Sequence, residues 1–194
     1  VVHPSVPANS VAEFIAYLKK NPDKLTFASS GNGTSQHLAG ELFKQAIGAQ
    51  YQHVPSKGAA LALTDLLGGH VSFMFDNLPS SIDHIRNGRL RALGVSTPQP
   101  LDLLPGVPTI ASFVPGYETS AFAGLGAPAN TPREVVDKLN KGVAIALADA
   151  KLKARILDLG GVPMPMTPPE FAKLLAEETE KWGKVIRAAK IKPV

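Results

Sequence analysis

Residues 25–48 read LTFASSGNGTSQHLAGELFKQAIG, and this stretch determines the class of fold that we expect. Its first part, Leu25–Ser29, is short and apolar and runs into a turn of glycine and hydroxyl residues, which predicts a buried strand. Its second part repeats apolar residues at helical spacing and stops at Gly48, a residue typical of helix C-termini. A strand that turns directly into a helix is the building unit of an α/β fold.

The same alternation continues on both sides of this stretch. Upstream, Ser10 and Glu13 have the spacing of a capping box for a helix that ends at Asn21-Pro22. Downstream we expect, in chain order, a strand at 51–54, a helix at 58–67, a strand at 71–75, a helix at 80–87 and a strand at 90–96. This order predicts a parallel sheet, with ligand sites at the carboxyl ends of its strands.

The C-terminal part of the chain has a different character. An apolar segment at 119–127 predicts one more strand, and three helices are expected at 131–148, 152–159 and 167–189. Because these helices have no sheet of their own, we expect residues 119–194 to complete a second α/β lobe whose strands lie upstream of Val1. A domain boundary is therefore expected near residue 119.

Composition and charge exclude several classes of protein. The 194 residues are 44% hydrophobic and 19% charged, which is typical of a globular chain, and prolines and glycines interrupt every apolar run that could span a membrane. The net charge of +4 comes from residues 151–194, where nine Lys and Arg accompany five Asp and Glu at helical spacing. That pattern indicates a solvated helix face, so we expect no nucleic-acid partner. The absence of cysteine excludes disulfides, thiolate metal sites and cysteine nucleophiles.

Three loops have the composition of an anion site. Residues 29–35 combine two glycines with four hydroxyl residues at a helix start, where backbone N–H groups and the helix dipole attract a carboxylate, phosphate or sulfate. The alternative is a helix that is merely well capped. Lys57, at the next strand-to-helix junction, pairs with an anion or is an ordinary surface lysine. Asp76, beside Asn77, accepts a donor from a ligand or holds its own loop as an Asx turn.

No catalytic, nucleotide or metal motif accompanies these loops. The chain has no GxSxG elbow, no GxxxxGK[ST] loop and no HExxH, and its five histidines form no i,i+4 pair. Gly31 and Gly33 lack the third glycine of a dinucleotide fingerprint. We therefore expect no catalytic residue, no metal and no cofactor.

Several segments together carry a family pattern along essentially the whole chain. They are residues 1–8, 30–43, 66–71, 74–77, 104–109, 128–132 and 181–186. In these segments the chain resembles the Bug family, the periplasmic solute receptors of tripartite tricarboxylate transporters. The resemblance implies an α/β, type II periplasmic-binding-protein fold, with one complete lobe at residues 4–118 and the C-terminal, mostly helical part of the other at residues 119–194. It also implies that the family's N-terminal segment is absent, in keeping with a chain that opens Val1-Val2-His3-Pro4 without a signal peptide.

The resemblance further implies a function and a set of site residues. The protein would be a periplasmic receptor, not an enzyme, that captures a small carboxylate between its lobes and delivers it to the membrane permease subunits. With only one lobe whole, we expect residues 1–194 alone to bind weakly. The implied ligand-binding residues are Ser30, Gly31, Asn32, Thr34, Ser35, Lys57, Gly58, Ala59, Asp76, Asn77 and Phe122.

Two other functions are compatible with the sequence. The first is an α/β enzyme that acts on a small carboxylate through Asp76 and a nearby histidine. In that case Asp76→Asn should abolish turnover, whereas a receptor would lose only affinity or selectivity. The second is a fragment that self-associates, as a dimer or a swapped assembly, through the apolar helix faces of residues 119–194. Light scattering distinguishes this case from a monomer.

Overall fold

The structure, a computed structural model, describes residues 1–192. Its contacts divide these residues into two compact units, Val1–Ala121 together with residues 185–192, and Phe122–Lys184. The boundary after Ala121 lies close to the one expected after residue 118, and residues 185–192 group with the first unit. The assignment of the two predicted domains to two lobes of a receptor stays a prediction.

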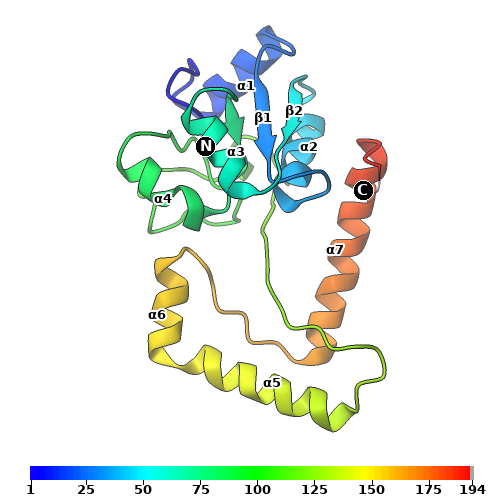
Figure 1. The fold of residues 1–194 in the computed structure, drawn as a ribbon. Coiled ribbons are helices and arrows are strands. Elements are labelled where there is room, and N and C mark those ends of the chain that lie inside the picture. The colour runs from blue at the N-terminus through cyan, green and yellow to red at the C-terminus, as the bar shows by residue number, and fades with distance from the viewer. Residues whose placement is uncertain (193–194) are drawn as a thin grey trace. The chain divides into compact units, whose positions relative to one another are not determined.

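The first unit is built on a three-stranded parallel sheet. Its strands are β1 (Thr26–Ser29), β2 (Gln52–Pro55) and β3 (Phe73–Met74), and they lie side by side in the order β2-β1-β3 (Figure 1). Ser29 is in register with Pro55, and Ala28 is in register with Met74. The three strands therefore end at the same edge of the sheet, as the alternation of strands and helices predicts.

Four helices precede, connect or follow these strands. They are α1 (Val11–Lys20), α2 (Ser35–Ile47), α3 (Ala59–Leu67) and α4 (Leu78–Arg86), and a short 3-10 helix follows at Ile110–Ser112. The capping box of α1 forms in part: the Ser10 hydroxyl accepts from the Glu13 N–H at 3.2 Å, but the Glu13 carboxylate accepts from Asn9 instead of Ser10. These helices confirm the expected α/β class.

Two buried tyrosines fix α2 against the core. The Tyr51 hydroxyl donates to the Gly40 carbonyl at 2.6 Å, and the Tyr117 hydroxyl donates to the Ala39 carbonyl at 3.0 Å. Burial raises the pKa of both tyrosines, so both hydroxyls stay protonated donors. The middle of α2 is therefore held at a set distance from the sheet.

Two predicted strands do not form among the described residues. The segment at 90–96 makes only isolated bridges, from Arg91 to Val2 and from Val95 to Thr109. The segment at 119–127 makes one backbone hydrogen bond, from Thr119 N–H to the Ser96 carbonyl at 3.1 Å, and residues 120–130 are exposed. An apolar segment becomes a strand only when a neighbouring strand forms hydrogen bonds with its backbone groups. Within residues 1–192, the segment at 119–127 has no such neighbouring strand.

The second unit contains α5 (Arg133–Ala148), α6 (Ala150–Asp158) and most of α7 (Pro168–Ala188). The start of α7 is a capping box, in which Glu170 accepts from the Thr167 N–H at 2.8 Å, and this hydrogen bond lowers the pKa of the Glu170 carboxyl. Neither α5 nor α6 has a buried residue. Within residues 1–192, no helix combines the length and the hydropathy that a membrane crossing requires.

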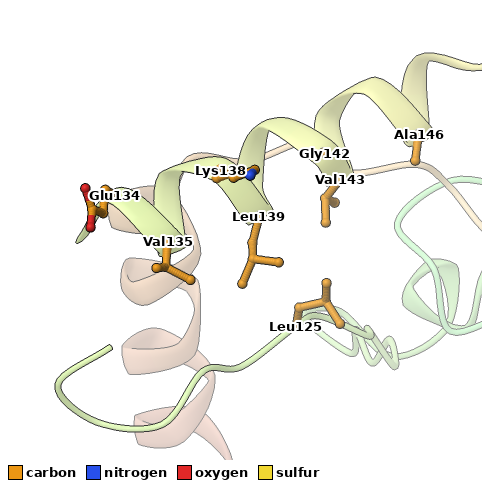
Figure 2. A pocket seen from close by; sticks show the side chains of 8 residues that line it. All are labelled: Leu125, Glu134, Val135, Lys138, Leu139, Gly142, Val143 and Ala146. Atoms are coloured by element: carbon orange, nitrogen blue, oxygen red, sulfur yellow. The ribbon is translucent and has the colours of Figure 1, made fainter. Parts of the chain in front are cut away.

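A groove of about 830 Å³ runs along the exposed apolar face of α5 (Figure 2). In Figure 2, Leu125 points toward Leu139 and Val143, and Val135 lies farther along the same face of α5. The lining of the groove combines the opposite charges of Glu134 and Lys138 with apolar or small residues, which is not the chemistry of an anion site. The predicted self-association through such helix faces remains a prediction.

Candidate functional site

Three loops meet at the carboxyl edge of the sheet. They comprise residues 30–34 after β1, residues 56–58 after β2 and residues 75–77 after β3, and each leads into a helix. The Ser56 N–H donates to the Ser29 carbonyl at 3.0 Å, and a Cβ placed on Gly31 would lie 3.5 Å from the Ser56 carbonyl oxygen. The topology thus places every predicted ligand residue except Phe122 at one edge.

The loop after β1 depends on two glycines with positive φ. Gly31 has φ +139° and Gly33 has φ +74°, conformations that L side chains adopt only with strain. Thr34 is the N-cap of α2: its hydroxyl donates to the Gly31 carbonyl at 2.8 Å and lies 3.5 Å from the His37 backbone nitrogen. The predicted alternative of a capped helix is therefore part of the loop's structure, whatever else the loop binds.

Side chains occupy several of the N–H groups that the sequence suggested were free. The Ser30 N–H donates to Gln36 Oε1 at 2.7 Å, and the Gly31 N–H donates to Ser29 Oγ at 3.2 Å. The Gly33 N–H donates to His37 Nδ1 at 3.0 Å. Within residues 1–192, the N–H groups without an acceptor in and after this loop belong to Asn32, Ser35 and Gln36. The available donors therefore lie at the tip of the loop and in the first turn of α2.

The helices α3 and α4 also begin at this edge without side-chain caps. Gly58 precedes α3 at φ 124° and ψ 158°, and Asn77 precedes α4, but neither makes a capping hydrogen bond from a side chain. The first-turn N–H groups of a helix are unpaired unless a cap, water or ligand accepts from them. Lys57 is exposed beside them. Three helix N-termini with positive partial charge therefore face one edge of the sheet.

Asp76 holds its own loop and the neighbouring one. Its Oδ1 accepts from Gln36 Nε2 at 2.8 Å, and its Oδ2 accepts from the Ser80 hydroxyl at 2.6 Å. The loop-holding role of Asp76 is thus present, and a direct contact between Asp76 and a ligand stays a prediction. Our sequence reasoning missed Gln36, which is 2% exposed. The available signal was its spacing, because Gln36 lies one helical turn before Gly40 and so shares a face of α2 with it.

Two stacked histidines lie behind the loop. The rings of His37 and His53 are 3.8 Å apart at 12°, and the ring of Phe27 stacks on His53 at 4.6 Å. His53 Nε2 lies 2.6 Å from Ser29 Oγ. Burial lowers the pKa of both histidines, to about 4 for His53, and the nearby Lys44 charge adds to the effect. Both rings are therefore neutral at pH 7, with His37 Nδ1 free to accept from the Gly33 N–H.

The histidine pair should make the stability of the protein fall in acid. Folding lowers the pKa of His53 from its ordinary 6.5 to about 4, so the native state binds this proton more weakly than the unfolded state. The stabilisation is complete above pH 6.5 and is lost as the pH falls toward 4. Urea unfolding between pH 7.5 and 4 should show a steeper loss for the unmodified protein than for His53→Gln.

The control for this experiment is the exposed His70→Gln, which should retain the slope of the unmodified protein. Glu41, whose pKa burial raises, is present in all three proteins, so its effect cancels in the comparison. Parallel curves for the unmodified protein and His53→Gln would contradict the assignment.

Phe122 lies in the other unit. Its ring is 39% exposed and packs edge-on against Phe171, with centroids 6.0 Å apart. A part in ligand binding therefore stays a prediction. Among residues 1–192, no group of three or more His, Asp or Glu side chains is placed to hold a metal ion.

Comparison with known proteins identifies the family. A family model described as the tripartite tricarboxylate transporter family receptor matches residues 1–191. BugT of Bordetella pertussis is 32% identical over 195 residues, which cover 99% of this chain and 60% of BugT. The chain thus spans less than two thirds of the length of such curated relatives.

Solved structures agree with this match. The structure of Rpa4515 from R. palustris with adipate superposes with a TM-score of 0.91 at 37% identity, covering 100% of this chain and 65% of that one. MatC from Rhodopseudomonas palustris with bound malate gives a TM-score of 0.85 at 30% identity, covering 95% of this chain and 64% of that one. The predicted periplasmic-binding-protein fold is confirmed, and the chain belongs to the family of tripartite tricarboxylate transporter receptors.

Proposed function

We propose that the protein containing this chain is a periplasmic receptor that binds a small carboxylate at the carboxyl edge of the sheet and delivers it to the membrane subunits of a tripartite transporter. The observation that carries the proposal is the convergence of three helix N-termini on this edge, with unpaired N–H groups at Asn32, Ser35 and Gln36. The adipate and malate held by the two relatives support a carboxylate as the ligand.

The donors match a carboxylate in number and kind. A carboxylate oxygen accepts two hydrogen bonds, and backbone N–H groups at a helix N-terminus supply charge-assisted ones. Each contributes about 1.5–3 kcal/mol when partly dry, whereas micromolar affinity requires about 8 kcal/mol net. The loops of this unit would thus supply part of the affinity. We therefore retain the prediction that residues 1–194 alone bind more weakly than the whole protein.

The enzyme alternative lacks a geometric basis. Asp76 contacts Gln36 and Ser80, and within residues 1–192 no histidine pairs with it. The two stacked, neutral histidines instead contact the loop after β1: His53 Nε2 lies beside the Ser29 hydroxyl, and His37 Nδ1 accepts from the Gly33 N–H. A general acid and base require groups that exchange a proton with a substrate, and this arrangement supplies none.

The site can be tested by replacing each of two matched glycines, in separate variants, with a negatively charged aspartate. Gly33 (φ +74°) and Gly88 (φ +67°) share a left-handed backbone and open space around a new Cβ, but Gly88 follows the C-terminus of α4. In the whole protein, Gly33→Asp should weaken binding of adipate or malate about ten-fold or more, because its carboxylate repels the ligand's and competes for the same donors.

Gly88→Asp carries the same charge and a similar backbone strain, and it should leave affinity within about two-fold, because it lies away from the three loops. Isothermal titration calorimetry gives both affinities. Equal losses in the two variants would place the site elsewhere. Absence of binding by the unmodified protein, to these and to other small carboxylates, would refute the proposed function.

A further inference from the structure

The Gln36 side chain joins the loop after β1 to the loop after β3. Its Oε1 accepts from the Ser30 N–H at 2.7 Å, and its Nε2 donates to Asp76 Oδ1 at 2.8 Å. The two bonded residues are 46 positions apart in the chain, and the side chain between them is almost completely buried. We call this chain of hydrogen bonds, Ser30 to Gln36 to Asp76, the amide bridge.

The amide bridge admits only one orientation of the Gln36 side chain. With the amide turned over, its NH₂ would face the Ser30 N–H and its oxygen would face the Asp76 carboxylate, two repulsive contacts. In the observed orientation, the negative charge of Asp76 polarises the amide toward the Ser30 N–H. The buried polar groups therefore satisfy one another only as a set.

The bridge also accounts for an acidic residue beside an anion site. Both oxygens of Asp76 have donors of the protein itself, Gln36 Nε2 and the Ser80 hydroxyl. A carboxylate whose oxygens already have donors is held in one orientation, and its charge is stabilised by those donors of the protein. Asp76 thus has a structural use that requires no ligand.

We propose that Gln36 is a positioning residue of the carboxylate site and that Asp76 serves as its anchor instead of contacting the ligand. By turning the Ser30 N–H inward, Gln36 fixes the loop so that the N–H groups of Asn32 and Ser35 remain available to the ligand. This inference rests on the proposed function, and it names residues through which the loops after β1 and β3 act together.

The experiment exchanges the two partners. In Gln36→Glu, a second carboxylate faces Asp76, and we expect the whole protein to bind adipate or malate about ten-fold more weakly. In the double variant Gln36→Glu with Asp76→Asn, the amide and the carboxylate trade places. The new amide at position 76 would donate to the new carboxylate at position 36, which would still accept from the Ser30 N–H. The Ser80 hydroxyl would still donate to the side-chain oxygen at position 76.

The double variant should therefore recover affinity to within about three-fold of the unmodified protein, which a direct ligand contact by Asp76 would not allow. The control is Gln45→Glu, the same change at an exposed position of α2 whose amide makes only a long hydrogen bond, of 3.5 Å, to the Val185 carbonyl; it should leave affinity unchanged. A double variant that binds no better than Gln36→Glu would overturn the inference and leave the proposed function standing.

Hydrogen exchange of the Ser30 amide tests the bridge without a ligand. Measured by NMR in the ligand-free protein, this amide should be protected in the unmodified protein and in the double variant, and it should exchange at least about ten-fold faster in Gln36→Met. Equal exchange in Gln36→Met and the unmodified protein would overturn the bridge even if no carboxylate bound. A protein with a protected Ser30 amide and no carboxylate binding would instead refute the proposed function.

Discussion

Replacing Phe27 with alanine should lower the free energy of unfolding by about 4 kcal/mol, the usual cost of removing a fully buried phenylalanine ring. Phe27 is 0% exposed and lies at the centre of the first unit. Its ring packs edge-on against Tyr51 at 5.4 Å and stacks on Phe73 at 5.8 Å. The cavity would be surrounded by aromatic rings on several elements, which cannot collapse together to fill it.

The Phe27→Ala substitution should also disturb the structure of the loop after β1. The ring of His53 stacks on Phe27, and His53 Nε2 lies within hydrogen-bond distance of Ser29 Oγ, at the start of that loop. Urea unfolding followed by circular dichroism measures the effect on stability. Phe113→Ala, the same change at a ring that is 41% exposed, is the matched control and should cost less than about 1 kcal/mol. Similar losses at both positions would contradict the packing described here.

Replacing Gly40 with alanine should destabilise the protein by about 2 kcal/mol, although alanine normally stabilises a helix by about 1 kcal/mol over glycine. Gly40 lies in the middle of α2, and an added Cβ would lie 2.6 Å from Cζ of Phe27. The ring cannot retreat, because Tyr51, Phe73 and His53 surround it. The helix cannot retreat either without losing the Tyr51 hydrogen bond to the Gly40 carbonyl.

The matched control is Gly142→Ala on α5. Nothing lies within 4 Å of a Cβ added at Gly142, so the same substitution should raise stability by up to about 1 kcal/mol. The expected changes in the free energy of unfolding thus have opposite signs in the two variants, and thermal or urea unfolding measures both. A Gly40→Ala variant as stable as the unmodified protein would show that α2 does not approach β1 as closely as the structure indicates.

Local signals in the sequence predicted most of the first unit. Ser10 and Thr34 cap their helices, Gly48 ends α2, and strands alternate with helices in the predicted order. Each of these features depends on residues within one turn or one strand, so a single segment carries the whole signal. The strands expected at 90–96 and 119–127 depend on a partner strand, which no local pattern reveals.

The sequence by itself determined which loops gather at the carboxyl edge, because parallel strands end at one edge whatever their side chains are. It also carried the glycines and hydroxyls that give the loop after β1 its shape. Only the tertiary structure decided which of the loop's donors remain available. Gln36 and His37 take up the Ser30 and Gly33 N–H groups, and Asp76, 40 positions after Gln36, holds the glutamine amide in place. A hydrogen bond between distant segments forms only after the sheet has brought them together, so no local sequence pattern predicts it.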